Sequence, residues 1–530
     1  MSYSRYQSPA PEGQIAIVCC SPDNFHSLKE DKLTAFPENY KECPLTEIEL
    51  NVFNEDIFRS ALDCGFNVIM YPGSDLPGDW VKYTEYALDF CAAHGIKLII
   101  NSPILNYQVN IKSKDYKDHD YKRQWPRTYV EKFKKHVALG GWQIKDEPSY
   151  QFWHDEHATS TTDTESTTIS NVDNLESIKD CDCPSIFPNF RVITQTDSRN
   201  MIFMNLAGST DQYWIGKQLL ENFLDEYIAT FNPPLLSYDF YPIQFKIDEN
   251  GKKMLTVDNS HMYEFLGIFS TKSKNTGKPF WAYCLCLAHD TGGAKYPESE
   301  VGMLRYEAFT ALAHGAQGLV FWGYKQGYRV VEISKDTPKD PTNPNSELQT
   351  IVEKHVIESD EVAPLDLYGN KTDLWYNVRK VIYEISKFHN IFYNCEMTRR
   401  IICNGHGEEV NMNGDGGILK MRAMGKGVLI SRIETPDSKH KDRNGKPLMH
   451  KYIVVVSSDP FNNQEIDFYY ENKDGVDKGL STLVDTMDGI EFPVTPPTST
   501  STSTSTSTHT STATWHPKIL APGGYYILKY

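Results

Sequence analysis

The chain has 530 residues, and 53 Lys and Arg residues against 70 Asp and Glu residues give it a formal net charge of −17. This length predicts two or three domains, and a hydrophobic fraction of 40% with 12% aromatic residues excludes a wholly disordered chain. The acidic balance argues against a nucleic-acid partner, because such a partner would require a basic face. The sequence contains no run of about 18 apolar residues, so we expect no membrane-spanning helix.

The first residues and the cysteines of the chain both bear on its cellular compartment. The first residues lack the apolar stretch of a signal peptide, which indicates a cytoplasmic protein, or a periplasmic or secreted one whose leader has been removed. The 11 cysteines are an odd number, so at least one is unpaired. Cys181 and Cys183 have no second pair at ligand spacing, so we expect no metal site. The cysteines expected as buried free thiols are Cys19, Cys20, Cys284 and Cys286.

Short apolar runs alternate with longer amphipathic stretches over the first two thirds of the chain. The predicted strands cover residues 15–20, 67–71, 97–101, 141–145, 201–206, 235–239, 280–287 and 318–322. The predicted helices cover residues 54–64, 80–94, 128–136, 213–230, 261–270 and 304–314. Eight strands alternating with helices are typical of an α/β protein with a (β/α)8 TIM barrel. A doubly wound open sheet is the alternative, but the turn after the first strand, Ser21-Pro22-Asp23-Asn24, is not the Gly-rich phosphate turn of that fold.

The rhythm changes after the barrel, which we assign to residues 1–362. Residues 363–394 read as a linker and a closing amphipathic helix, and residues 395–530 as a C-terminal antiparallel β-sandwich of short strands. Two polar stretches, residues 157–184 and 498–512, have no apolar period and predict long surface loops.

Catalytic residues of a TIM barrel lie at the carboxyl ends of its strands. The fourth strand ends in Lys145-Asp146-Glu147-Pro148, and strict alternation places Gln143, Lys145 and Glu147 on one face and Asp146 on the other. If that face is the barrel interior, Glu147 lies at the mouth, where apolar surroundings raise the pKa of a carboxyl group and make it a general acid. The alternative is that Asp146 and Glu147 cap the next helix.

The sixth strand brings a second carboxyl group, Asp239, on one face with Ser237 and Tyr241. Two carboxyl groups beside a cleft are the equipment for hydrolysis of a glycosidic bond: one protonates the leaving oxygen and the other attacks or activates water. We therefore predict Glu147 and Asp239 as catalytic residues. The alternative for Asp239 is a turn residue that supports Tyr241.

The other strand ends supply candidate ligands for sugar hydroxyl groups. The seventh strand ends without a Glu, and His289 is a polar residue available there. Trp322, at the end of the eighth strand, offers a flat apolar face on which a sugar can stack, or is a core residue. The remaining candidates for substrate binding are Asp146, Asn205, Tyr241, Tyr71 and Asn101.

The segment Gly-Trp-Gln-Ile-Lys-Asp-Glu-Pro-Ser at residues 141–149 resembles the strand-four signature of barrel glycoside hydrolases related to family 42 β-galactosidases. In those enzymes the Glu before Pro is the acid/base, so the resemblance implies that role for Glu147. Asp146 stands where they usually carry the Asn that binds the 2-hydroxyl group. Residues 236–242 and 305–318 look like those of uncharacterised glycosidase-like proteins from gut Bacteroidetes, and residues 521–525 are similar to the closing strand of sandwich domains appended to such barrels.

The leading hypothesis is a glycoside hydrolase that cleaves O-glycosidic bonds of a β-linked oligosaccharide or glycoside. The alternative is a non-catalytic carbohydrate-binding barrel that kept the aromatic cleft, which the missing Glu on the seventh strand favours. A lyase with Lys145 as a Schiff base is a third hypothesis, although a Lys beside two acids is more typical of an ion pair. We expect a carbohydrate partner and no cofactor, while a homo-oligomer stays open because nothing in the sequence specifies an interface.

Overall fold

The computed structural model describes most of the chain, and the predictions for Cys181, Cys183 and the two polar loops lie outside the part it describes. The described residues are 7–20, 28–29, 43–44, 53–72, 80–101, 127–147, 186–207, 216–247, 251–291, 294–339, 342, 348–413, 418–470, 482–484, 491–492 and 514–529.

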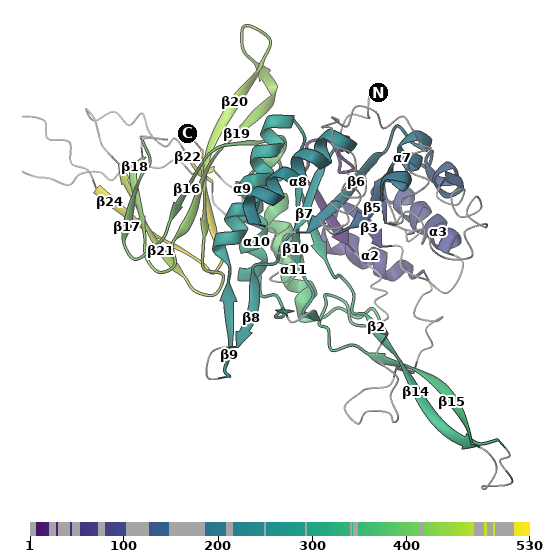
Figure 1. Cartoon of the computed structure of the whole chain (residues 1–530). Helices are drawn as coiled ribbons and strands as arrows, with labels where there is room; N and C mark the ends of the chain where they lie inside the picture. Colours follow the sequence, from purple (N-terminus) through teal and green to yellow (C-terminus); the bar gives the residue numbers. More distant parts are fainter. Residues whose placement is uncertain are drawn as a thin grey trace, which may run out of the picture.

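Eight parallel strands close into a barrel in the order β1-β13-β10-β7-β6-β5-β4-β3 (Figure 1). The strands are β1 (Ala16–Cys20), β3 (Val68–Pro72), β4 (Lys97–Asn101), β5 (Leu139–Asp146), β6 (Met201–Ala207), β7 (Leu236–Asp239), β10 (Phe280–Leu285) and β13 (Gly318–Trp322). Each coincides with a predicted strand, so the TIM barrel is confirmed. A helical segment follows each strand before the next, which is what a parallel barrel requires.

The helices surround the barrel. They are α2 (Glu55–Cys64), α3 (Trp80–Ala93), α7 (Ile186–Thr196), α8 (Gly216–Phe231), α9 (Asn259–Thr276), α10 (Val301–Ala313), α11 (Asp373–Ser386) and α12 (His389–Phe392), with a further helical segment at residues 127–133. Local signals set their ends: Asn54 caps α2 by accepting from the Asp56 N–H, and Gly65 ends it in the left-handed conformation with φ 104°.

The strands carry two apolar layers. Outward side chains pack with the helices in one large core, and inward side chains such as Val18, Phe203 and Val320 fill the barrel. Trp281 fills the interior only because its register partner is Gly318, at which a Cβ atom would lie 2.5 Å from the indole Nε1. The barrel is thus a packed core whose chemistry is confined to its rim.

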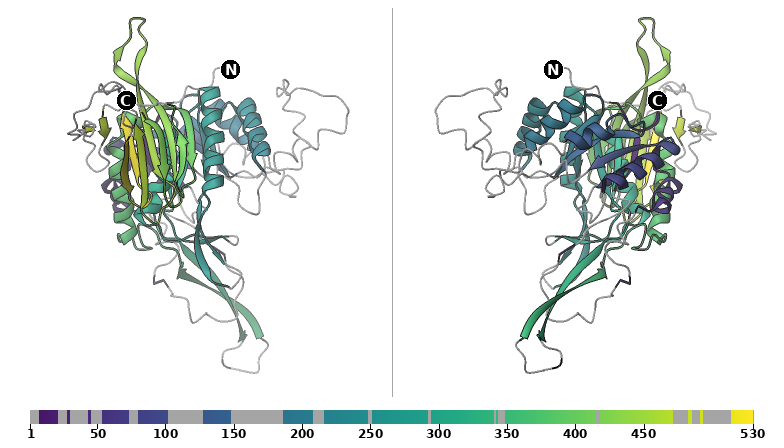
Figure 2. Two further views of the ribbon diagram at one scale, coloured as in Figure 1. Left: turned by 90° about the vertical axis from the view of Figure 1, so that its left-hand side faces the viewer. Right: turned by 90° about the vertical axis from the view of Figure 1, so that its right-hand side faces the viewer.

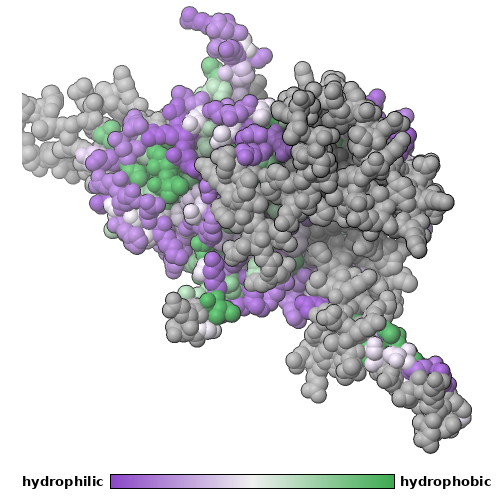
Figure 3. Space-filling model, viewed as in Figure 1, coloured by the Kyte–Doolittle hydropathy of each residue, from purple (hydrophilic) through white to green (hydrophobic). Residues whose placement is uncertain are grey.

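Antiparallel hairpins extend from the carboxyl ends of the barrel strands (Figures 1 and 2). One sheet has the order β11-β12-β8-β9, from β8 (Ile243–Ile247), β9 (Lys253–Val257), β11 (Asp290–Thr291) and β12 (Ala294–Lys295), and another joins β2 (Leu28–Lys29), β14 (Tyr328–Pro338) and β15 (Leu348–Glu358). Ile247 of β8 is 70% exposed, and Figure 3 shows apolar surface near the end of that hairpin. These elements were not predicted from the sequence.

A β-sandwich lies against the barrel, as the predicted fold class requires (Figure 2). Its first sheet has the order β16-β19-β20-β25-β22-β23, from β16 (Glu396–Cys403), β19 (Val428–Lys441), β20 (Pro447–Ser457), β22 (Thr482–Val484), β23 (Glu491–Phe492) and β25 (Tyr525–Lys529). The second has the order β17-β18-β21-β24, from β17 (Glu408–Asn411), β18 (Ile418–Ala423), β21 (Gln464–Tyr470) and β24 (Thr514–Leu520). The boundaries given above for the three segments stay a prediction.

Two further expectations concern the described residues. The nine cysteines among them are all free and buried, as predicted for Cys19, Cys20, Cys284 and Cys286. Among the helices in the described ranges, none combines the length and the apolar character needed to cross a bilayer.

Candidate active site

The bottom of the site is shaped by a β-bulge in β5. Gln143 pairs with Phe203 of β6, but the next pair is Lys145 with Met204, so Ile144 is an extra residue in the ladder. A bulge shifts the alternation of side chains by one position. Asp146 therefore pairs with the inward-facing Asn205, and the strict alternation predicted from the sequence is wrong for this strand.

A left-handed backbone conformation brings Glu147 to the same mouth of the barrel. Its backbone has a φ of 42°, in the left-handed region, and its N–H donates to the Asn205 carbonyl oxygen over 3.0 Å. A non-glycine residue in this region costs about 1 kcal/mol or more and is held there by its surroundings. The turn re-aims the Glu147 side chain, which is exposed and contacts Asp239 on β7.

Asp239 is the buried member of the group. Its side chain is 7% exposed, and it forms a hydrogen bond with the Glu147 carboxyl group. Burial raises its pKa well above the ordinary value, and the charges of Glu147 and Asp146 raise it further. Asp239 therefore keeps its proton to a higher pH than an isolated Asp would. Its Oδ1 atom is buried without a hydrogen-bond partner in the described structure.

Asp146 completes a group of three carboxyl groups, with Glu147 just after β5 and Asp239 at the end of β7. Its Oδ1 accepts from Asn205 Nδ2 over 3.0 Å and from Gln143 Nε2 over 3.2 Å. The Asp146 residue is partly open to solvent, but neighbouring protein atoms desolvate its carboxyl group. This desolvation and then the charge of Glu147 raise the pKa of Asp146 to about 6. The Asn205 hydrogen bond, the Lys145 charge and the Gln143 hydrogen bond oppose that rise.

An aromatic wall borders the carboxyl groups. Tyr241 lies nearly parallel to Trp322, with ring centroids 6.0 Å apart. His289 stacks on Tyr296 at 4.7 Å and meets Trp322 edge-on at 5.0 Å. Burial and then the Asp239 charge raise the pKa of Tyr241 well above 10, so its hydroxyl keeps its proton beside the carboxyl groups. The partly exposed faces of Tyr241 and Trp322 form an apolar surface at the mouth.

The structure brings most of the predicted site residues together. Glu147, Asp239, Asp146 and Asn205 form the polar group, and Tyr241, His289 and Trp322 belong to the aromatic wall. Asn101 ends β4, beside β5, on the inward series that contains Ile99.

Tyr71 is placed elsewhere. It belongs to the outer core between barrel and helices, where its ring stacks on Tyr83 of α3 at 4.7 Å. The alternation of β3 explains this position, because Val68 and Met70 take the inward places. Tyr71 therefore lies apart from the carboxyl groups and the aromatic wall at the barrel mouth.

Sequence reasoning missed several residues of the site. Gln143 is 1% exposed, and its Oε1 is a second buried acceptor with no partner in the described structure. Ser237 donates to Asn205 Oδ1 over 2.9 Å, which orients the Asn205 amide toward Asp146. Tyr296 comes from a loop after β10 that gave no periodic signal. Gln143 and Ser237 lie on the same strand faces as predicted site residues, so the alternation of side chains along these strands could have identified them from the sequence.

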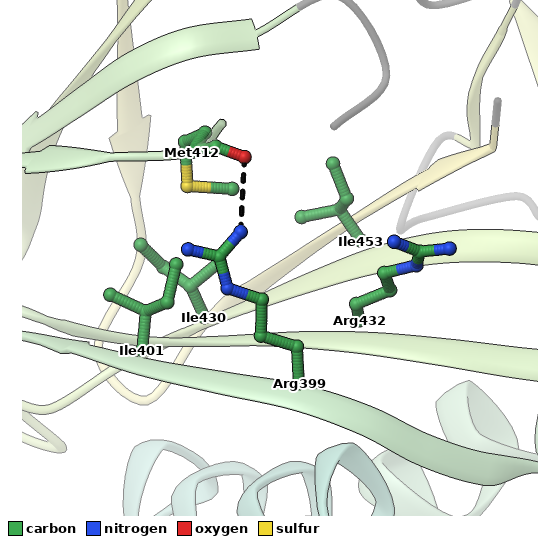
Figure 4. A pocket seen from close by; sticks show the side chains of 6 residues that line it. All are labelled: Arg399, Ile401, Met412, Ile430, Arg432 and Ile453. Carbon is green, nitrogen blue, oxygen red and sulfur yellow. Dashed lines mark hydrogen bonds between the residues drawn. The ribbon is translucent and has the colours of Figure 1, made fainter. Parts of the chain in front are cut away.

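The described residues contain no group of three or more His, Cys, Asp or Glu side chains arranged to hold a metal ion. Lys145 is partly buried, and its charge lowers the pKa of Asp146. A small pocket lined by Arg399, Arg432 and four apolar side chains lies within the sandwich, where Arg399 donates to the Met412 carbonyl oxygen over 3.2 Å (Figure 4). It lies on β16, β19 and β20 and not at the barrel mouth.

Comparison with known proteins gives structural likeness only. No protein-family model matches the chain, and no curated protein is similar to it. Among solved structures, a β-galactosidase from the psychrophilic Marinomonas ef1 has 12% identity and a TM-score of 0.39, over 71% of this chain and 60% of that one. A family 42 β-galactosidase from G. stearothermophilus has 11% identity and a TM-score of 0.44 over 100% of both chains. A β-glucosidase from Thermotoga maritima has 11% identity and a TM-score of 0.36, over 72% of this chain and 98% of that one. The chain thus spans less than two thirds of the first of these proteins, and its function is inferred from its own site residues.

Proposed function

We propose that this protein is a glycoside hydrolase in which Glu147 is the general acid/base and Asp239 is the second catalytic carboxyl group. The observation that carries the proposal is the position of these two groups at the carboxyl ends of β5 and β7, on either side of β6, where the Glu147 carboxyl group is close enough to raise the pKa of Asp239. A glycosidic oxygen is too basic to leave without a proton, and the raised pKa of Asp239 keeps a proton beside Glu147 to a higher pH than an isolated Asp would. Glu147, the exposed partner, delivers the proton to the leaving oxygen.

Two other features support a carbohydrate substrate. Gln143 Oε1 and Asp239 Oδ1 are buried acceptors without a partner in the described structure, and ligand hydroxyl groups are donors that would satisfy them. The aromatic wall of Tyr241 and Trp322 offers the apolar face against which the C–H side of a sugar ring packs. Polar acceptors beside an aromatic face match the two sides of a pyranose.

The first test is hydrolysis of a panel of 4-nitrophenyl glycosides by the wild type, by Glu147→Gln and by Glu131→Gln, an exposed Glu that serves as the matched control. We expect Glu147→Gln to lower kcat/KM by about 10²–10⁴-fold and Glu131→Gln to match the wild type. The loss should be larger for glycosides of alkyl alcohols than for 4-nitrophenyl glycosides, since 4-nitrophenolate leaves with little protonation. Equal activity in all three proteins would mean that another carboxyl group is the acid.

A carbohydrate-binding barrel without turnover is the second candidate. The observation that favours it is the end of β10, which brings the apolar Leu285 to the rim near the aromatic wall. In that case isothermal titration calorimetry would detect sugar binding by the wild type and by Glu147→Gln alike, with no hydrolysis by either.

A further inference from the structure

The aromatic wall is built from two segments of the chain that a small antiparallel sheet joins. Tyr241 lies between β7 and β8, whereas His289 and Tyr296 lie on either side of the hairpin formed by β11 and β12. The Tyr296 N–H donates to the His289 carbonyl oxygen over 2.9 Å, which extends the pairing of β11 with β12. Lys295 of β12 pairs with Phe245 of β8. The sheet therefore fixes the segment with His289 and Tyr296 against the segment with Tyr241.

Gln244 of β8 connects the two segments directly. Its Nε2 atom donates to the Tyr241 carbonyl oxygen over 3.3 Å and to the Tyr296 hydroxyl oxygen over 3.3 Å. A primary amide carries two N–H donors, so this one side chain serves both acceptors. The strand β9 fixes the position of Gln244 in turn, because Thr256 pairs with it and donates from Oγ1 to its backbone carbonyl oxygen over 3.1 Å. The amide of Gln244 thus ties the two segments of the wall together.

The four rings of the wall contact one another in a closed circuit. Tyr241 meets Tyr296 edge-on with ring centroids 5.8 Å apart, and Tyr296 stacks on His289 at 4.7 Å. His289 meets Trp322 edge-on at 5.0 Å, and Trp322 lies nearly parallel to Tyr241 at 6.0 Å. Because each ring touches two others, a shift of one ring moves its neighbours. Gln244 holds two adjacent members of this circuit, so it influences the orientation of all four rings.

We propose that Gln244 is a positioning residue of the site, which sets through Tyr241 and Tyr296 the shape of the wall that binds the sugar ring. This inference rests on the proposed function, because it takes a sugar as the occupant of the wall. Gln244 acts through the two tyrosines and takes no part in proton transfer. The wall contacts the sugar ring in the ground state and in the transition state alike, so a disturbed wall weakens substrate binding and leaves the chemical step unchanged.

The first test measures kcat and KM for the best substrate of the 4-nitrophenyl glycoside panel. We expect Gln244→Ala to raise KM by about 5–20-fold, with kcat within about twofold of the wild type, since two hydrogen bonds to the wall are lost. Lys246→Ala, at an exposed side chain on the same strand, is the matched control and should keep both constants. Gln244→Glu keeps the length of the side chain but has no N–H to donate when ionised, so it should resemble Gln244→Ala. A side chain needed for its packing alone would be rescued by Glu, and that result would overturn the inference.

A double-mutant cycle isolates the contact between Gln244 and Tyr296. Tyr296→Phe removes the acceptor and retains the ring, so it should raise KM by about 3–10-fold on its own. In the Gln244→Ala background the same change should raise KM by less than about twofold, because the hydrogen bond is already absent. Full additivity of the two effects would count against the contact as the cause. If circular dichroism shows that Gln244→Ala does not fold, Tyr296→Phe alone still tests whether this hydrogen bond sets KM.

The outcomes separate this inference from the proposed function. Turnover that is lost in Glu147→Gln, with KM unchanged in Gln244→Ala and in Tyr296→Phe, would overturn the role of Gln244 and leave the hydrolase in place. A fall of kcat in Gln244→Ala at unchanged KM would also overturn it. If no glycoside in the panel is hydrolysed, the proposed function fails, and calorimetry with the same glycosides measures Kd instead. Binding weakened by about 5–20-fold in Gln244→Ala would then support the inference, whereas equal binding, or no binding by the wild type, would overturn it.

Discussion

At the scale of single residues, the chemistry of the mouth depends on amide side chains that orient a carboxyl group. Asn205 is fully buried, accepts from Ser237 with its oxygen and donates to Asp146 with its nitrogen. Because the donated hydrogen bond favours the ionised form, it holds the pKa of Asp146 below the value that burial alone would set. Ser237 and Asn205 thus determine the pH at which Asp146 becomes an acceptor.

This relation predicts the acid side of the pH profile. Protonation of Asp146, with a pKa of about 6, should lower kcat/KM as the pH falls below that value. Asn205→Ala removes the donor, so the acid limb should move upward by about one pH unit. Ser237→Ala is the control, since it leaves the Asn205 donor in place and should move the limb much less. An unchanged limb in Asn205→Ala, with the fold intact by circular dichroism, would show that Asp146 does not control it.

At the scale of elements, a buried carboxyl group joins α10 to β10. Glu307 is 3% exposed and accepts from the Leu285 N–H, beyond the point at which β7 and β10 stop pairing at Ala282. Burial raises its pKa to about 8 from 4.5, against the opposing effect of that hydrogen bond. Between these two values the folded chain binds a proton that the unfolded chain has lost, so the free energy of unfolding falls as the pH rises.

We therefore expect Glu307→Gln to gain stability relative to the wild type as the pH rises from about 5 to 9. The Gln carbonyl oxygen still accepts from Leu285, and the variant has no charge to bury. The measurement is Tm by scanning calorimetry across that range, reported as the difference from wild type, because Asp146 and Asp239 change the slope in the same direction in both proteins. Glu12→Gln, at an exposed Glu, is the control. A difference in Tm that does not grow with pH would contradict a buried, proton-binding Glu307.

At the scale of the whole molecule, the barrel and the sandwich share one apolar core. The helix α10 is buried on nearly all sides, and the ring of its Phe309 stacks on Tyr525 of β25 with centroids 3.5 Å apart. Close approach is required here, since a Cβ on Gly302 would lie 2.2 Å from the Pro460 carbonyl oxygen. Arg400 of the sandwich also donates to Nε2 of the buried His314 over 3.2 Å, just after α10.

A shared core predicts that the two parts unfold together. We expect one calorimetric transition for the whole chain, and Tyr525→Ala should lower its Tm by removing about 3–5 kcal/mol of buried contact. Tyr383→Ala, at a side chain 65% exposed, should change stability by less than about 0.5 kcal/mol. Two separate transitions, with only one affected by Tyr525→Ala, would mean that the sandwich folds independently of the barrel.

The sequence alone determined the barrel, because parallel strands buried on both faces leave continuous apolar runs such as residues 97–101 and 318–322, each followed by a helical period. The rule that catalytic residues lie at the carboxyl ends of strands led to the prediction of Glu147, Asp239 and Trp322, and each of them lies at such an end. Tertiary structure decided how these side chains point. The bulge at Ile144 and the left-handed backbone of Glu147 depend on pairing with β6, and no local residue pattern encodes that pairing. The two hairpin sheets after the barrel strands and the place of Tyr296 in the aromatic wall were not predicted either. Contacts between distant segments stabilise these elements, and their short strands carry little periodic signal of their own.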